Sequence, residues 1–473
     1  MRRLIFLPWL AAFLHAQAIE PLPYVRTFAD TLIEKGLDRH GSRHTALWAG
    51  VIDTQGFTVP RDGVPPPEGV RPNDRAVGGC NLYHDAVTLQ FFPVLSAVTG
   101  DSRYRDAARG YVRDFLRVAQ DPVTGFLAWG EHLYYDFFRD APAEERRSHE
   151  MLEWTPPWGL LWDADPEATA RAIAAIRYHY YGDDPALWFN RHASWGRAGF
   201  QAPRGQPWIK HTGLYSYSFL FLHSRSGEPL WRRWGLDTGA LYWNYRLPAT
   251  NLTMGCLGDP RPATKNASAG ATLLAYWLLK AWRLAPEETL LRDRAVALLR
   301  AYDRHFYDVA RDEYRTEVAL DGTPLSENTV APWHFAYGSA SILPYGRVAA
   351  YFARTLESGE FTSIAKKVAA IARRTPLPER FSVEGIAFAL NLSLDLYDLT
   401  AEDRYIEDAR HYAGVAVKTF WVERDGRGLF VRQPGDRYYE SKVGTGALAA
   451  GLLRLHLKQT PGSSDPGLYD WTF

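Results

Sequence analysis

The stretch NLYHDAVTLQFFPVLSAVTGDSRYRDAARGYVRDFLRVA, residues 81–119, decides the fold class. Its first part, 81–98, is apolar almost all round, as a helix that is covered on every side must be. Its second part, 102–119, is amphipathic with one charged face, and a short turn at 99–101 separates the two parts. The stretch therefore predicts a hairpin of one buried helix and one helix that faces water.

The same pair of helices recurs along the chain at a spacing of roughly 50 to 60 residues, which indicates a repeat architecture. The further pairs are 148–163 with 166–181, 208–224 with 228–245, 266–283 with 287–306, 331–354 with 360–373, and 384–399 with 402–420. The apolar stretch 442–457 has no partner after it. We expect the first amphipathic stretch, 24–37, to close a ring against it.

We therefore predict an all-α fold, an (α/α)n toroid of six or seven helical hairpins with no separate β domain. A closed ring gives one layer of buried helices and one layer that faces water. An open α-solenoid is the alternative, but the two helices of its repeat would be more alike. Residues 19–473 are expected to form this single catalytic domain, with short pieces such as 427–433 forming hairpins in loops.

The first 18 residues have the layout of a secretory signal peptide. Arg2 and Arg3 precede an apolar run, and small residues around Ala18 offer a cleavage site. The run is too short for a membrane span, and no later stretch is apolar enough, so we expect a secreted or periplasmic protein. In that compartment Cys80 and Cys256 are expected either to pair or to remain as two free thiols.

The composition also limits the partners. Lys and Arg together number 54, as do Asp and Glu, so no overall field attracts nucleic acid. An anionic substrate would have to be recognised locally. The unusual feature is the number of aromatic residues, with 17 Trp and 26 Tyr, because flat rings stack on the faces of sugars.

Residues 125–163 hold the densest group of side chains suited to chemistry. Glu131, His132, His149 and Glu150 lie there among tryptophans such as Trp129. Imidazole, carboxylate and phenol groups move protons, and the rings beside them suit a carbohydrate. For the group as a whole, this pattern favours a binding or catalytic site over a set of buried aromatics.

Polar groups also recur where the apolar helices are expected to begin. They are Asn81 to Asp85, His149-Glu150, Lys210 to Thr212, Lys265 to Ser268, Trp333 to Tyr337, and Tyr438 to Lys442. Parallel inner helices would bring these groups to one mouth of the ring, where helix N-termini favour anions. Helix capping explains Asn81 and Ser268 but not the histidines. The mouth suits a sugar that carries a carboxylate.

Motifs for nucleotide or serine-hydrolase chemistry are absent from the sequence, and no Cys/His spacing indicates a structural zinc. His149-Glu150 begins an HExxH-like pattern that fails at its last position. We therefore expect no cofactor and no metal ligands, with a divalent ion on His149, Glu150 and Glu153 as the alternative.

Four stretches carry a resemblance to a known group of enzymes: Trp129-Gly-Glu-His132, His149-Glu150, Lys210-His211-Thr-Gly-Leu-Tyr215, and Trp333-His334-Phe-Ala-Tyr337. With the toroid, they resemble the toroidal polysaccharide lyases and the α/α-barrel glycoside hydrolases. The chain looks most like uronate-directed lyases of the glucuronan and alginate type with a seven-hairpin toroid. The resemblance implies an anionic polysaccharide or oligosaccharide as substrate.

The resemblance implies β-elimination, in which a base removes the C5 proton of a uronate and O4 leaves. It implies that Tyr337 is the acid/base group beside His334. It further implies that His149 and His211 either move the second proton or neutralise the carboxylate. Carboxylate binding is expected from Arg43, Arg191, Lys210 and Asn251, and sugar contacts from Trp129, His132 and Trp333.

Other functions remain open at this stage. A glycoside hydrolase, such as a glucuronidase, needs two carboxyl groups, for which Glu131, Glu150, Glu327 and Asp85 are candidates. A non-catalytic glycan-binding protein would keep the aromatic rings but would not need histidines at several helix starts. A sugar epimerase or isomerase also fits the toroid, although export argues against it.

Overall fold

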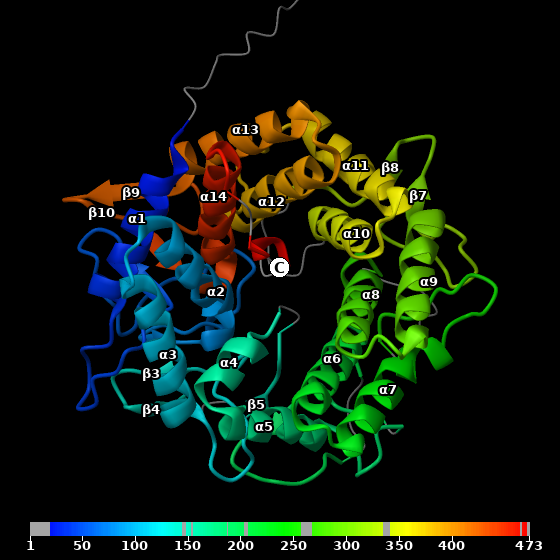
Figure 1. Ribbon diagram of the computed structural model, residues 1–473, viewed down its shortest axis with the longest axis horizontal. Coiled ribbons are helices and arrows are strands. Elements are labelled where there is room, and N and C mark those ends of the chain that lie inside the picture. The colour runs from blue at the N-terminus through cyan, green and yellow to red at the C-terminus, as the bar shows by residue number, and fades with distance from the viewer. Residues whose placement is uncertain are drawn as a thin grey trace, which may run out of the picture.

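Helical hairpins form a closed ring with two concentric layers (Figure 1). The computed structural model describes residues 19–143, 148–152, 155–186, 188–202, 207–256, 267–333, 341–463 and 466–470, and only the backbone of residues 267–271 and Tyr469. The signal-like residues 1–18 lie outside this range. The predicted all-α toroid is confirmed, and the described residues contain no separate β domain.

The inner layer consists of the helices that the sequence marks as apolar. They are α2 (Leu82–Thr99), α4 (Trp158–Ala164), α6 (Ile209–Ser226), α8 (Ala267–Leu284), α10 (Leu343–Leu356), α12 (Val383–Thr400) and α14 (Thr445–Gln459). Helix α12 shows why they lie inside, because it buries residues on all of its faces. A helix buried in this way needs neighbours on both sides and an outer helix behind it, whereas the short α4 buries only Trp158 and Leu161.

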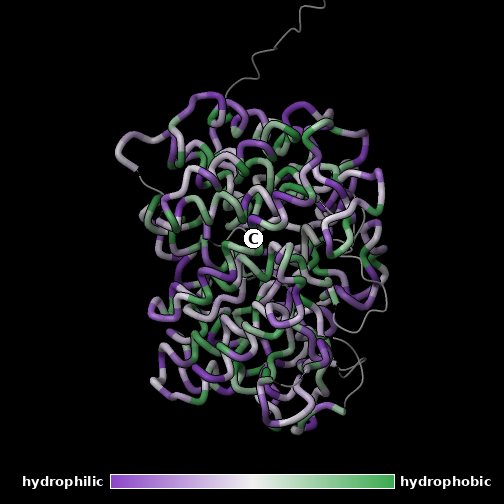
Figure 2. Tube along the Cα trace, turned by 90° about the vertical axis from the view of Figure 1, so that its right-hand side faces the viewer, coloured by the Kyte–Doolittle hydropathy of each residue, from purple (hydrophilic) through white to green (hydrophobic). Residues whose placement is uncertain are grey.

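The outer layer consists of the amphipathic helices. They are α1 (Pro21–Thr31), α3 (Arg103–Ala119), α5 (Pro166–Ala175), α7 (Pro229–Asn244), α9 (Thr289–Phe306), α11 (Gly359–Arg374) and α13 (Asp403–Phe420). Hydrophobic and hydrophilic residues alternate along the trace in the side view (Figure 2). Helix α14 contacts α12, α2 and α1, so the first and last helices close the ring as predicted.

Two predicted inner helices begin later than expected. In place of a helix over 148–163, residues 148–149 form a strand and α4 begins at Trp158, directly after Pro156 and Pro157. In place of 331–354, α10 begins at Leu343 with Pro344 in its first turn. A proline disfavours helical backbone in the residue before it but fits the first turn of a helix, which explains both starts.

Short antiparallel strands lie in the loops between helices. They pair as β1 (Val51–Asp53) with β11 (Tyr438–Glu440), β2 (Gly79–Cys80) with β3 (Tyr135–Asp136) and β4 (Ala141–Pro142), β5 (Ser148–His149) with β6 (Ala193–Ser194), β7 (Tyr307–Asp308) with β8 (Glu313–Tyr314), and β9 (Trp421–Arg424) with β10 (Arg427–Phe430). The hairpin of β9 and β10 confirms the one expected near 427–433. Cys80 and Cys256 do not pair with each other in a disulfide.

The C-terminal segment turns back to the centre of the ring (Figure 1). Its last described residues form the short helix η5 (Leu468–Asp470), and the buried Lys280 of α8 donates a hydrogen bond to Asp470 over 2.9 Å. Leu468 is buried there as well. Across the part of the chain that the structure describes, no helix combines the length and the apolar character needed to cross a membrane.

A buried ion cluster joins the inner helices α10, α12 and α14. The carboxylate of Asp395 accepts hydrogen bonds from Arg347 over 3.1 Å and from Arg454 over 2.8 Å, and all three side chains are buried. Burial would raise the pKa of Asp395, but the guanidinium groups of Arg454, Arg347 and the nearby Arg354 outweigh it and hold that pKa below its usual value. The carboxylate of Asp395 therefore links α12 to the inner helices on both sides of it, α10 and α14.

We expect the substitution Asp395→Asn to lower the free energy of unfolding by about 3 kcal/mol, because it removes the carboxylate that the buried Arg347 and Arg454 share and leaves Arg454 the more distant carboxylate of Asp398, at 3.5 Å. Urea unfolding followed by circular dichroism measures this. The matched control is Glu360→Gln, which removes an exposed partner of Arg300 and is expected to cost less than about 1 kcal/mol. Equal losses in the two variants would contradict the assigned role of the cluster.

Candidate active site

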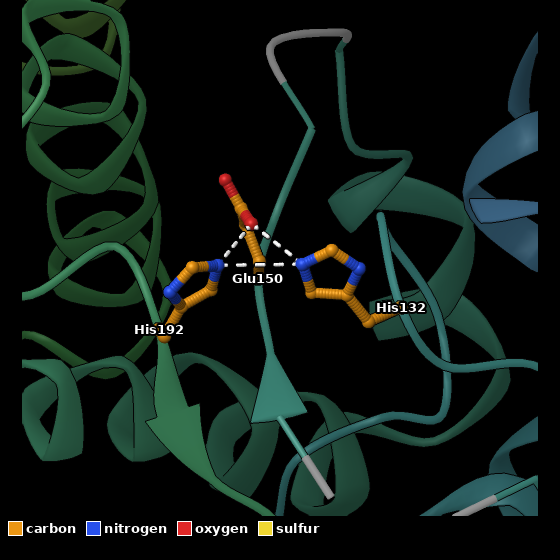
Figure 3. A group of neighbouring side chains, drawn as sticks. All are labelled: His132, Glu150 and His192. Atoms are coloured by element: carbon orange, nitrogen blue, oxygen red, sulfur yellow. Dashed lines mark hydrogen bonds and ion pairs between the residues drawn. The ribbon is translucent and has the colours of Figure 1, made fainter. Parts of the chain in front are cut away.

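A short strand pair fixes the centre of the site. Strands β5 and β6 are antiparallel, with His149 opposite Ala193, so the next residues, Glu150 and His192, face one another. The His192 imidazole Nε2 lies 2.7 Å from Glu150 Oε2 (Figure 3). Residues far apart in the sequence thus meet by strand register.

A glycine brings the third member of the site to the same point. Gly130 has a φ of +83°, and a Cβ atom on it would lie 2.0 Å from the carbonyl oxygen of Glu150. Only glycine fits this approach, and the Glu131 N–H then donates to that carbonyl over 3.0 Å. The loop carries His132 next, and its Nε2 lies 3.1 Å from Glu150 Oε2.

The three side chains are arranged like metal ligands. The Nε2 atoms of His132 and His192 are 3.3 Å apart, and one ligand atom from each of the three residues lies within 4.8 Å of the others. Ligands about 2.1 Å from one ion are separated by about 3 Å in common geometries, so these spacings fit a divalent cation. Imidazole and carboxylate together suit Mn, Zn or Fe(II).

The surroundings orient the imidazole of His132 for this role. Its Nδ1 lies 3.1 Å from Oδ1 of Asp74, a buried carboxylate that also pairs with Arg71. Such a carboxylate fixes the tautomer in which Nδ1 carries the proton and Nε2 is left to bind a metal. In the absence of a metal, burial opposes the charge on His132, but Asp74 and Glu150 outweigh it and raise its pKa.

Glu150 carries its negative charge although it is buried. Burial raises the pKa of a carboxyl, but hydrogen bonds from His132 and His192 and the charges of His211 and Arg191 hold the pKa of Glu150 far below its usual range. His211 Nε2 lies 3.7 Å from Glu150 Oε1, and Arg191 Nη1 lies 3.5 Å from the same oxygen. Glu150 is therefore suited to bind a cation and not to donate a proton.

A second buried carboxylate lies next to the centre. Glu131 accepts from Arg71 over 2.8 Å and pairs with Lys442 over 3.3 Å. Lys442 lies in the short helix η4 (Ser441–Val443) just before α14, while His211 lies in the first turn of α6. The starts of α6 and α14, two of the six groups that the sequence singled out, therefore lie next to this centre.

The structure brings together five of the predicted site residues. His132 and Glu150 form the centre, Arg191 and His211 contact Glu150, and Lys210 lies beside Trp208. Tyr337 and His334 lie outside the described residues, as does Glu153.

Other predicted site residues have different surroundings. Trp129 and Trp333 are buried, so neither ring is open to a sugar. Trp129 instead donates to His149 over 3.2 Å, and Trp333 donates to the Thr375 carbonyl over 2.9 Å. The prediction of two sugar platforms was therefore wrong.

His149 is buried, and its imidazole packs against other rings inside the protein. Its Nδ1 lies 2.9 Å from His179 Nε2, and its ring stacks on Phe126 at 4.1 Å. Burial is the main cause that lowers its pKa well below the usual value. The sequence offered His149, Glu150 and Glu153 as an alternative metal site. In the structure the histidines beside Glu150 that suit a metal are His132 and His192.

Two residues that were predicted to bind a substrate carboxylate, Arg43 and Asn251, have other contacts. The backbone N–H of Arg43, an exposed residue, donates to Asp140. Asn251 has a left-handed backbone with a φ of +58°, and its side chain accepts from Arg246 over 2.9 Å. Both residues shape loops in the structure.

Sequence reasoning missed His192, Asp74 and Trp208. His192 follows Arg191, which was predicted, but it lies in a segment with no regular apolar spacing. No sequence pattern marks it, because the strand at 193–194 that places it opposite Glu150 is only two residues long.

Fold and site together define a helical toroid with a cluster at one mouth that suits a divalent cation. A family model described as periplasmic pectate lyase matches residues 71–226, a segment that contains His132, Glu150, Arg191, His192 and His211. This segment covers the part of the chain from which the centre of the site is built.

Solved toroids resemble the whole chain. A D-mannose isomerase has a TM-score of 0.50 and 10% identity, over 93% of this chain and 97% of that chain. A cellobiose 2-epimerase from Bacillus thermoamylovorans B4167 has a TM-score of 0.50 and 9% identity, over 93% and 99%. A sugar epimerase from a ruminal bacterium has a TM-score of 0.50 and 11% identity, over 93% and 99%. This likeness concerns the fold, while the family match supports a carbohydrate-processing enzyme.

We expect the protein to bind one divalent cation, such as Mn²⁺, and the substitution Glu150→Gln to weaken this affinity at least about 100-fold, because changes behind the ligands alone cost about 10- to 100-fold. Isothermal titration calorimetry measures the affinity directly. His223→Ala, a half-exposed histidine at the far end of α6, is the control and should bind as the wild type does. Unchanged binding in Glu150→Gln would rule out this site.

Proposed function

We propose that this protein is an exported polysaccharide lyase that cleaves a uronate polymer by β-elimination. The observation that carries the proposal is the cluster of His132, Glu150 and His192 with Arg191 beside it, within the segment that matches the pectate lyase model. Polygalacturonate is the first substrate to test because of that match, ahead of glucuronan and alginate.

The chemistry explains why cations are needed there. The C5 proton of a uronate is weakly acidic while the neighbouring carboxylate keeps its full charge. A divalent cation held by His132, Glu150 and His192 would neutralise that carboxylate and so make the proton easier to remove. Arg191 provides a planar guanidinium beside the same point, which suits a carboxylate.

The electron balance of the reaction is simple. A base takes the C5 proton, the electron pair of the broken C–H bond forms the C4=C5 double bond, and the C4–O4 bond breaks. The leaving O4 then receives a proton. No oxidant or reductant is involved, and the product is a 4,5-unsaturated uronate with a new reducing end on the other fragment.

The surroundings of the carboxylates favour elimination over hydrolysis. A glycoside hydrolase needs one carboxyl group that is protonated and one that is ionised, on either side of the bond. The pKa of Glu150 is held far below its usual range, and Glu131 is paired with Arg71 and Lys442. Glu327, the third candidate, pairs with Arg311 in an exposed loop.

Asp85 is a hydrolase candidate with a raised pKa, and its position argues against a role in catalysis. Burial raises its pKa to about 7, while Tyr111 donates to it over 2.7 Å. Its side chain is fully buried in α2. A polysaccharide would have to displace the core to reach it.

The first test uses the purified mature protein with Mn²⁺ and polygalacturonate, glucuronan or alginate. Ultraviolet absorbance of the 4,5-unsaturated uronate is expected to rise together with reducing ends on at least one polymer. Chelation with EDTA should abolish the rise and added Mn²⁺ should restore it. Reducing ends without absorbance would establish hydrolysis instead.

A second test concerns proton transfer. The resemblance to uronate lyases assigns this role to Tyr337, beside His334. We expect Tyr337→Phe to lower kcat by at least about 100-fold, in keeping with the contribution of general acid–base catalysis, while polymer binding is retained. Steady-state kinetics and an equilibrium binding measurement separate the two effects. A variant with wild-type kcat would remove Tyr337 from the mechanism.

A further inference from the structure

Trp208 is an exposed aromatic ring that the sequence prediction did not select. It directly precedes α6, and 39% of its surface is exposed, in contrast to the buried Trp129 and Trp333. An exposed tryptophan offers a flat apolar face to solvent, which is the feature that a sugar ring stacks on. Trp208 is therefore a better candidate than Trp129 or Trp333 for the ring on which a sugar stacks.

The backbone around Trp208 is held in place. Trp208 pairs with Cys256 in an isolated β-bridge, and the next residue, Ile209, donates its N–H to the Gly255 carbonyl over 3.1 Å. The Tyr242 hydroxyl donates to the carbonyl of Pro207, the residue before the ring. The ring is thus presented from a fixed backbone, which lowers the entropy lost when a ligand binds.

Two cations lie against this ring. The guanidinium carbon of Arg191 is 4.9 Å from the ring centroid, and Nζ of Lys210 is 5.7 Å from it. Both distances are within the range of cation–π attraction. Both cations lie over the ring, so the part of the ring that stays exposed is an apolar surface beside two positive charges, which suits a ligand that is flat and anionic, as a hexuronate is.

Arg191 connects this ring to the centre of the site. Its Nη1 atom lies 3.5 Å from Oε1 of Glu150, while its guanidinium carbon lies near the Trp208 ring. Lys210 in turn precedes His211, which also contacts Glu150. A ligand on Trp208 would therefore lie next to a ligand on the His132–Glu150–His192 cluster, with Arg191 between them.

We propose that Trp208, with Arg191 and Lys210, forms a subsite for the uronate residue adjacent to the one that reacts. This inference rests on the proposed function and makes it more specific: the substrate is a chain of at least two uronates, and the neighbouring carboxylate is recognised together with its ring. Trp208 is a positioning residue for the substrate.

The test uses the full chain loaded with Mn²⁺ and tri-galacturonic acid as the probe. We expect Trp208→Ala to weaken binding about tenfold by calorimetry, which corresponds to about 1.4 kcal/mol. On a polymer that the wild type cleaves, KM should rise about tenfold while kcat stays within about twofold. Trp208→Phe, which keeps an aromatic ring, should recover most of the affinity.

Control variants separate this role from a general effect. Trp282→Ala changes another partly exposed tryptophan, which carries Arg292 at 5.6 Å from its centroid but lies at the other end of an inner helix, α8. It should bind the probe as the wild type does. Lys210→Met should weaken the binding of tri-galacturonic acid and reduce its dependence on salt.

The outcomes distinguish the subsite from the proposed function. Weaker binding in Trp208→Ala, with no change in Trp282→Ala or in the Mn²⁺ affinity, supports the subsite. If no uronate polymer is cleaved but binding still depends on Trp208, the subsite stands and the lyase proposal fails. Equal binding in Trp208→Ala and the wild type overturns the subsite, whether or not the protein is a lyase. Absence of any binding by the wild type overturns it as well.

Discussion

Burial of the inner helices on both sides is the constraint on which the rest of the structure depends. A helix such as α12 has no face that can be left to water, so it needs a neighbour on each side, and the series ends only when the last helix meets the first. Its polar residues must be satisfied by those neighbours. Asp395 pairs with Arg347 from one side and with Arg454 from the other.

Close packing accompanies this closure. Gly451 of α14 faces Asn391 of α12, and a Cβ atom on it would lie 2.9 Å from the Asn391 amide nitrogen. That amide donates to the Ala447 carbonyl over 3.2 Å, while the Asn391 side-chain oxygen accepts from Arg454 over 3.0 Å. The small residue lets α14 approach closely enough to satisfy a polar group in the core. Closure of the ring thus depends on a close fit between α14 and α12 as well as on the apolar surface that the two helices bury.

The repeat pattern made the ring predictable. The spacing of apolar residues gave most helices to within two residues, as at 81–98 against Leu82–Thr99, because periodicity reports directly which faces are buried. It failed at the starts of α4 and α10, where prolines or a strand lie, and it placed the ends of α1 and α5 too late, because the chain continues there as a π-helix and a 3-10 helix. The centre of the site was only partly predictable, because His192 reaches Glu150 through a two-residue strand pair that leaves no periodic signal.

The local charge balance explains how a chain with no net charge would recognise an anionic polymer. Glu131 is matched by Arg71 and Lys442, so this pair of cations is already used within the protein. Glu150 is surrounded by His132, His192, His211 and Arg191, and of these the Arg191 guanidinium is charged at every working pH. Salt screens charges over about 10 Å at ordinary ionic strength, so the field of this charge acts on a bound sugar and not on a distant polymer. Recognition would therefore depend on contact, and the exposed Trp208 ring provides an apolar surface beside the Arg191 charge.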